Sequence, residues 1–307
     1  MNDKNFECSR KISIGGEKNG WGDLGDPRFE RDRTWNCGRF NVSLARPLVM
    51  GVLNVTPDSF SDGGDHDDPE GALAFASRLL AEGADIIDVG GESTRPGAKE
   101  LSFYQELYRV LPVVSELVHR GVCVSVDTRH PKVAAACVDE GAAIINDVSG
   151  FRDPEMIRLA QGCDAGLIVM HMKGEPSSMQ QEANYDDVVS EVSAYLSRQA
   201  TKLESCGIAH ERICIDPGPG FGKKAVHSLA LLKATEVLAA LGWPLMVATS
   251  RKGFVGQASG VSIARERVMG SVASALFAVE HGASIARVHD VAAIVQAFRM
   301  LQAIKLA

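Results

Sequence analysis

The chain lacks any long run of lysine and arginine. Its 32 basic residues are outnumbered by 39 acidic ones, which gives a formal net charge of -7. Proteins that hold nucleic acid or an anionic membrane surface usually present clustered basic charge. We therefore expect neither as a partner. A cationic pocket for an anionic small molecule is still compatible with this composition, because net charge does not describe a cleft.

The sequence also lacks paired cysteines and long apolar runs. Its 7 cysteines contain no C-x-x-C pair, and an odd number in a chain of this length does not indicate a disulfide framework or a metal site. No apolar run approaches the roughly 18 residues that span a bilayer, and the first residues contain no signal-peptide core. We expect reduced thiols and a cytoplasmic protein.

The N-terminal part divides into an extension and a hairpin. Residues 1–33 carry scattered glycines and charges without apolar period, which predicts a flexible extension with no assigned function. Between Trp35 and Leu44 apolar and polar residues alternate around Cys37-Gly38, which predicts a short β-hairpin suited to plug the bottom of a barrel. Residues 34–307 are expected to form a single domain, because α/β barrels of roughly 250 residues are common.

The rest of the sequence alternates short apolar runs with longer segments of helical period. This pattern predicts parallel strands joined by helical crossovers. The expected strands are 48–54, 84–90, 122–127, 142–147, 167–171, 212–216, 245–249 and 284–288. Glycines that suit helix C-caps lie between a helical segment and the next strand at 83, 121, 141, 207, 242 and 282. Eight units favour a closed TIM (β/α)8 barrel over an open doubly wound sheet.

Polar residues end nearly every predicted strand, and a TIM barrel carries its active site at those ends. Any one of them could only cap the following helix, but residues 217–222 separate Asp216 from any helix. Asp127, Asn146 and Asp216 suit a flat heterocycle with several N–H donors. Cations and neutral ligands that suit a pyrophosphate with Mg²⁺ are Asn54, Arg95, Lys252, Arg287 and His289.

Seven segments resemble those of a known family. They are 50–64, 90–97, 125–129, 145–148, 216–218, 250–252 and 287–290. In this order they closely resemble the dihydropteroate synthases, and the match runs from about Cys37 to the C-terminus. The first two segments are long and specific. The resemblance implies condensation of (7,8-dihydropterin-6-yl)methyl diphosphate with 4-aminobenzoate, which gives 7,8-dihydropteroate and pyrophosphate in folate biosynthesis.

The resemblance also implies roles for individual residues. Those expected to bind the pterin diphosphate are Thr94, Asp127, Asn146, Asp216, Lys252, Arg287, Val288 and His289. Those expected to receive 4-aminobenzoate are Arg95, Pro96, Phe221 and Ser250. Asn54 is expected to ligate Mg²⁺ on the diphosphate. Residues 56–64 and 92–99 are expected to close over the substrates, with Phe60, Asp62 and Lys252 taking part in catalysis.

This chemistry is a dissociative substitution that needs no strong general base, because a neutral aryl amine is nucleophilic and cations stabilise the departing pyrophosphate. Two alternatives stay open. One is a pterin-binding methyltransferase that passes a methyl group from a folate to a corrinoid, against which the motif at 92–96 and the rim cations argue. The other is a non-catalytic pterin-binding subunit, against which the two intact loop motifs argue.

Several residues carry secondary expectations. Pro219 and Ala248 depart from the commonest family pattern and are expected to affect the affinity for substrate analogues, not activity itself. His171 could contact ligand or satisfy backbone groups, and we favour the structural interpretation. The resemblance implies a homodimer. An apolar stripe could form the dimer interface or face the barrel, and we favour the second alternative. The stripe comprises Val272, Ala275, Leu276 and Val279.

Overall fold

The computed structural model describes residues 11–14, 33–56, 69–92, 101–174, 179 and 183–307. Eight parallel strands form one sheet in the order β10-β11-β4-β5-β6-β7-β8-β9. A parallel bridge between Ile215 and Leu245 joins the two ends of this order, and the Ile215 N–H donates to the Pro244 carbonyl over 2.9 Å. The sheet is therefore closed into a TIM barrel, and the open doubly wound alternative is excluded.

All eight predicted barrel strands are present, and their starts differ from the predicted ones by no more than two residues. The strands are β4 (Leu48–Asn54), β5 (Ile86–Gly90), β6 (Val124–Asp127), β7 (Ile144–Asp147), β8 (Gly166–Met170), β9 (Ile213–Asp216), β10 (Met246–Val247) and β11 (Ile285–Val288). The largest difference is in β10, which has two residues instead of the predicted five. The bridge to β9 is made by Leu245, the residue directly before β10.

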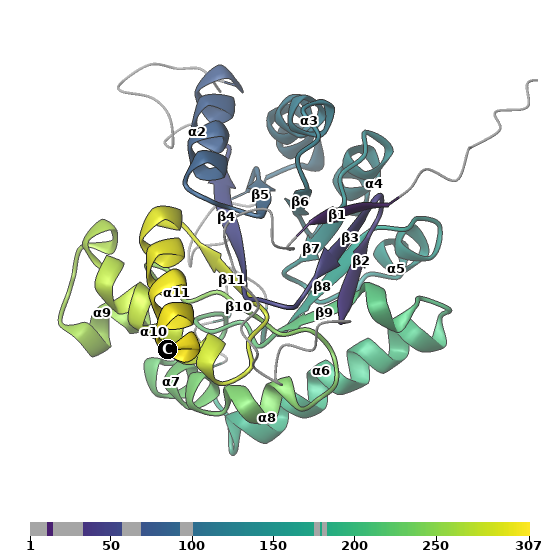
Figure 1. Cartoon of the computed structure of the whole chain (residues 1–307). Coiled ribbons are helices and arrows are strands. Elements are labelled where there is room, and N and C mark those ends of the chain that lie inside the picture. Colours follow the sequence, from purple (N-terminus) through teal and green to yellow (C-terminus); the bar gives the residue numbers. More distant parts are fainter. Residues whose placement is uncertain (1–10, 15–32, 57–68, 93–100, 175–178, 180–182) are drawn as a thin grey trace, which may run out of the picture.

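Helices form a ring around these strands (Figure 1). They are α2 (Pro69–Ala81), α3 (Phe103–His119), α4 (Pro131–Asp139), α5 (Pro154–Gln161), α6 (Val188–Ser205), α7 (Ala225–Lys233), α8 (Thr235–Ala239), α9 (Gly253–Ser259), α10 (Val268–Glu280) and α11 (Val291–Leu306). Short 3-10 turns occur at η2 (His210–Arg212) and η3 (Ala264–Glu266). The six predicted cap glycines all have positive φ, between 79° and 106°, which confirms their place after helix ends.

A small sheet closes the bottom of the barrel. The predicted hairpin consists of β2 (Thr34–Cys37) and β3 (Phe40–Ser43). Trp35 and Phe40 of the hairpin are buried against the lower barrel strands, and the Trp35 indole N–H donates to the Arg212 carbonyl over 2.9 Å. The sequence did not predict a third strand, β1 (Ile12–Ile14), which pairs in parallel with β3. Three residues are too few to show a period.

The barrel interior changes from apolar to polar along the strands. Every second residue of a strand faces the interior. Near the hairpin these positions are apolar, and Ile86, Ile144 and Ile285 pack against it. Two residues further along the same strands lie Asp88, Asn146 and Arg287. The end of the barrel at the strand C-termini, which we call the barrel mouth, is therefore polar inside.

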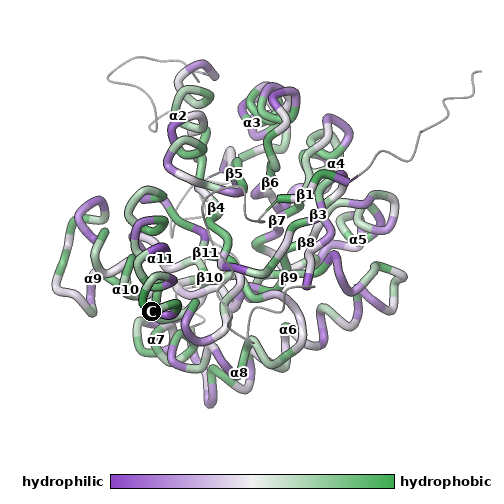
Figure 2. Tube along the Cα trace, in the orientation of Figure 1, coloured by the Kyte–Doolittle hydropathy of each residue, from purple (hydrophilic) through white to green (hydrophobic). Residues whose placement is uncertain are grey.

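The outer layer of the core lies between the strands and the helices. Figure 2 shows largely hydrophobic strands and hydrophilic segments that recur along the surrounding helices. Ala275 and Val279 are buried in this layer, and Val272 and Leu276 pack against it. The stripe on α10 therefore faces the barrel, as the preferred interpretation had it. Six cysteines lie in the described residues and all are free. Among the helices described, none is long and apolar enough to cross a membrane.

Candidate active site

The guanidinium of Arg287 links side chains from several strands at the barrel mouth. Its Nε donates to Asp88 Oδ2 and its Nη2 to Asp127 Oδ2, each over 2.6 Å. Asn146 Nδ2 donates to Asp88 Oδ2 over 3.2 Å. Residues of β5, β6, β7 and β11 thus meet in one hydrogen-bonded group.

Burial and neighbouring charges act against each other at Asp127 and at Arg287. Burial raises the pKa of Asp127 to about 7, although Arg287 acts in the opposite direction. Burial alone would lower the pKa of Arg287, but Asp88 and Asp127 together hold it above its ordinary value. The guanidinium therefore stays charged, and the acidic side chains of Asp88 and Asp127 accompany it.

Asp216 ends β9 and is buried. Its Oδ1 accepts a hydrogen bond from the Gly218 N–H over 2.7 Å, and among the described residues its Oδ2 accepts none. Burial raises the pKa of Asp216, whereas the nearby Lys252 lowers it. Gly218 has a φ of +61°, and a Cβ there would lie 2.2 Å from the His171 carbonyl oxygen. This turn therefore requires glycine, and its backbone binds only one of the two oxygens of Asp216.

Lys252 lies near the carboxylate of Asp216 and against an aromatic ring. Its Nζ donates to the Pro219 carbonyl over 2.6 Å and lies 4.6 Å from the centroid of the Phe221 ring. Burial lowers the pKa of Lys252 to about 8, and the carboxylate of Asp216 acts against this shift. The backbone of Pro219, a departure from the family pattern, is thus a direct partner of the ammonium group.

The turn after β10 brings Ser250 to His289. The Ser250 hydroxyl accepts from the His289 N–H over 3.1 Å and lies at the same distance from its Nδ1. Arg251 has a φ of 59°, which is unusual for a residue with a side chain. Its Nε donates to Asp290 over 2.9 Å, and Arg267 donates to its carbonyl over 2.9 Å. These contacts hold Ser250 and His289 together at the barrel mouth.

The remaining predicted residues fall into two groups. Asn54 ends β4 beside Gly90, and its side chain hydrogen-bonds to no other described residue. Val288 packs its side chain in the layer between strands and helices, so that only its backbone could face the barrel mouth. Predicted residues that lie outside the described ranges are Phe60, Asp62, Thr94, Arg95 and Pro96.

His171 has a structural environment. It is buried, its Nδ1 lies 2.8 Å from Lys223 Nζ, and its ring contacts Tyr195 edge-on. Burial lowers the pKa of His171 to about 3, so the imidazole is neutral near pH 7. The imidazole ring of His171 is therefore occupied by contacts within the protein, as expected for a structural residue and not a ligand contact.

Sequence reasoning missed two buried charged residues beside the site. Asp88 is fully buried and binds both Arg287 and Asn146. The sequence does contain a sign of this role: Asp88 is a carboxylate within the apolar run 86–89, and it lies on the same face of the strand as Ile86. Lys223 donates to the carbonyls of His171 and Phe221, each over 3.0 Å, and so supports the turn after β9. No local pattern distinguishes Lys223 from a surface lysine.

Known proteins are similar to this chain in sequence and in fold. The profile of the family described as "Pterin binding enzyme" matches residues 50–289. The chain is 45% identical over 276 residues to the dihydropteroate synthase of Neisseria meningitidis serogroup B, which covers 88% of this chain and 97% of that protein.

Two solved structures show the same similarity in three dimensions. The Xanthomonas albilineans dihydropteroate synthase with 4-aminobenzoic acid has a TM-score of 0.85 and 43% identity, covering 90% of this chain and 99% of that one. The Burkholderia cenocepacia dihydropteroate synthase complexed with 7,8-dihydropteroate has a TM-score of 0.82 and 45% identity, covering 89% and 96%. The similarity therefore extends over the barrel and the strand ends that carry the polar group.

Proposed function

This chain belongs to the dihydropteroate synthase family of pterin-binding enzymes, and we propose that it condenses (7,8-dihydropterin-6-yl)methyl diphosphate with 4-aminobenzoate at the barrel mouth. It is a transferase of folate biosynthesis. The observation that carries the site assignment is the convergence of Asp127, Asn146, Asp216 and Lys252 at the strand ends. Neither the corrinoid methyltransferase nor the non-catalytic subunit is supported by the relatives.

The buried polar group supplies the complement of a pterin ring. The carboxylates of Asp127 and Asp216 accept hydrogen bonds from ring N–H and amino groups, and Asn146 can donate and accept. Lys252 donates to a ring carbonyl or nitrogen. Arg287 uses Nε and Nη2 to hold Asp88 and Asp127, which leaves its Nη1 for a diphosphate oxygen.

The Asn54 side chain fits a magnesium ligand. Its carboxamide oxygen is a hard donor, and the side chain makes no hydrogen bond to other described residues. Mg²⁺ in proteins commonly keeps several waters and binds through one or two protein oxygens together with substrate phosphates. When bound, Mg²⁺ would supply charge neutralisation on the diphosphate. We propose that Asn54 holds it there, with His289 close to the same phosphates.

The protein's own groups then account for the substitution. The charges of Arg287 and Lys252 stabilise the departing pyrophosphate, while Asp127 and Asp216 hold the electron-rich pterin in place. The amine of 4-aminobenzoate attacks the methylene carbon, and its proton passes to solvent or phosphate. Phe221 and Ser250 would flank 4-aminobenzoate. Since Lys252 lies against the Phe221 ring, it connects the two substrate positions.

The reaction itself can be tested with a coupled pyrophosphate-release assay. Purified protein with Mg²⁺ should release pyrophosphate from the pterin diphosphate only when 4-aminobenzoate is present, and 7,8-dihydropteroate should form in equal amount. Absence of turnover at high protein concentration, with pterin binding detected by calorimetry, would support the non-catalytic subunit instead.

The protonation of Lys252 predicts a limit on activity in alkaline solution. As pH rises through about 8, the buried ammonium loses its proton, and kcat/KM for the pterin diphosphate should fall. An arginine at this position stays charged, so Lys252→Arg should lower kcat/KM at pH 7 but shift the alkaline limb upward. Initial rates between pH 6 and roughly 10 measure both effects. An unchanged alkaline limb in the variant would assign it to another group.

Asn54→Ala should act mainly on magnesium. Loss of one protein oxygen ligand should raise the Mg²⁺ concentration needed for half-maximal rate by about tenfold, because a ligand bond of this kind contributes on the order of 1.4 kcal/mol. The affinity for the pterin without its diphosphate should stay within about twofold. Calorimetry with the pterin and a Mg²⁺ titration of initial rate separate the two. Equal losses of Mg²⁺ affinity and pterin affinity would contradict the proposal that Asn54 binds the metal and not the pterin ring.

We also propose a cytoplasmic homodimer, the assembly and location expected from the sequence. The stripe on α10 cannot supply the interface because its members pack inward. Exposed apolar side chains on α10 and α11 offer a surface instead, and they include Met269, Phe277, Met300 and Ile304. Sedimentation velocity of the purified protein tests the assembly.

A further inference from the structure

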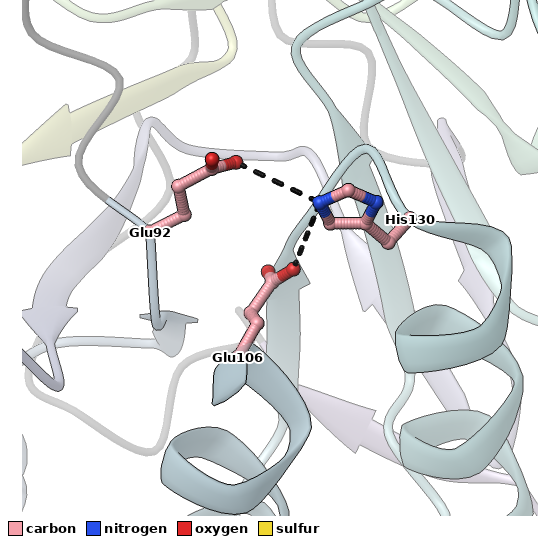
Figure 3. A group of neighbouring side chains, drawn as sticks. All are labelled: Glu92, Glu106 and His130. Carbon is pink, nitrogen blue, oxygen red and sulfur yellow. Dashed lines mark ion pairs between the residues drawn. The ribbon is translucent and has the colours of Figure 1, made fainter. Parts of the chain in front are cut away.

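A second cluster of ionisable side chains lies beside the substrate residues (Figure 3). Glu92 follows β5, Glu106 lies in the first turn of α3, and His130 precedes α4. His130 Nε2 lies 3.8 Å from Glu106 Oε2 and 4.0 Å from Glu92 Oε2. The three ligand atoms all lie within 4.8 Å of one another. In Figure 3 both carboxylates point toward the same ring nitrogen.

Glu106 is the unusual member, because it is fully buried. Within the described residues neither of its oxygens has a hydrogen-bond partner in good geometry, and the same is true of His130 Nε2. Burial raises the pKa of Glu106 to about 8, although the neighbouring Thr128 hydroxyl favours the charged form. A buried carboxylate without well-formed hydrogen bonds is costly, so this one requires a proton or a cation in the space that it faces.

The geometry favours a cation. Distances of 3.8 and 4.0 Å are too long for hydrogen bonds, yet they suit donors on either side of one ion. Tetrahedral zinc with bonds of about 2.1 Å places its ligand atoms about 3.4 Å apart, so His130 Nε2 would have to approach each carboxylate by about half an ångström. The two carboxylate oxygens lie within 4.8 Å of each other, and a water molecule would be the fourth ligand. One imidazole nitrogen with carboxylate oxygens suits zinc and its first-row neighbours better than magnesium.

We propose that Glu92, Glu106 and His130 form a binding site for a divalent first-row transition metal ion, with Zn²⁺ as its representative. The site is distinct from the magnesium position at Asn54 and does not depend on the function proposed above. Glu92 also accepts from the Leu101 N–H over 3.0 Å and from Arg129 Nε over 3.2 Å. These contacts fix the carboxylate in place, while the positive charge of Arg129 moderates the affinity.

The test is calorimetric titration of the EDTA-treated full-length protein with ZnCl2. Wild type should bind one equivalent through this site, and Glu106→Gln and His130→Gln should each weaken that binding by at least tenfold. His210→Gln is the matched control, because His210 Nδ1 lies 2.7 Å from Glu204 Oε1 in an exposed pair elsewhere. It should bind Zn²⁺ as wild type does.

Co²⁺ gives a second measurement that does not depend on the variants folding. The wild-type complex should show d–d absorption without a thiolate charge-transfer band, because the site has only nitrogen and oxygen donors. Binding that His210→Gln weakens as much as His130→Gln, a thiolate band, or no Zn²⁺ binding by wild type would each overturn the proposal. In the last case Glu106 holds a proton instead.

Discussion

Replacing Asp216 with asparagine should lower kcat/KM for the pterin diphosphate by about a thousandfold, which corresponds to about 4 kcal/mol. The side chain is buried, and its Oδ2 accepts no hydrogen bond from another described residue. An amide in its place presents a donor to the ring N–H groups and leaves them unpaired in a site that excludes water. Steady-state rates and calorimetry with the pterin measure the loss.

Asp147→Asn is the matched control for Asp216→Asn. Asp147 is equally buried at a strand end, but its carboxylate is used within the protein. It accepts from the Ser149 N–H over 2.7 Å, from the Ser149 hydroxyl over 2.9 Å and from the Phe151 N–H over 2.8 Å. Its substitution should therefore reduce stability and leave pterin affinity in the folded protein within about threefold. If the control lost affinity as strongly as Asp216→Asn, the proposed role of Asp216 would be wrong.

Arg287→Met should reduce the free energy of unfolding by about 3–5 kcal/mol and abolish activity. The substitution leaves Asp88 and Asp127 close together without the cation that Arg287 supplies. Asp88 is fully buried and cannot turn to solvent. Urea unfolding measures the loss of stability, and part of the loss should disappear at acid pH, where Asp127 is protonated in the folded and the unfolded state.

A double-mutant cycle separates the charge from the packing. Asp88→Asn should restore part of the stability lost in Arg287→Met, because it removes the uncompensated carboxylate. Arg120→Met supplies the surface comparison: its ion pair with Glu116 is nearly half exposed and should contribute at most about 1 kcal/mol. If Arg287→Met cost no more than Arg120→Met, the buried charge group would have no structural importance.

Local patterns in the sequence predicted the barrel well. Apolar runs and the glycines after helices report on neighbouring residues in the chain, so eight strands and six helix ends could be found one at a time. The hairpin was predicted on the same basis. Strand β10 came out shorter and β1 was missed, because strands of two or three residues carry no period.

The expectation that polar residues at strand ends form the active site identified most of the polar group. It could not tell which of these residues are available to substrate. It predicted both Asn146 and Asp147 as site residues. Side chains alternate between the two faces of β7, so Asn146 faces the barrel interior and contacts Asp88. Asp147 instead accepts hydrogen bonds from the backbone that follows β7. The same expectation missed Asp88, because Asp88 lies two residues before the end of β5. Burial and register decide which polar residue is available to substrate, and both depend on neighbouring strands.

The sequence by itself thus determined the order of strands and helices, the hairpin and the family, because each of these is written in short continuous segments. The tertiary structure alone decided which residues close the barrel between β9 and β10, the sharing of Arg287 between Asp88 and Asp127, and the meeting of Glu92, Glu106 and His130. Those features join residues from separate β/α units. Their energies arise from contacts between these units that no local pattern encodes.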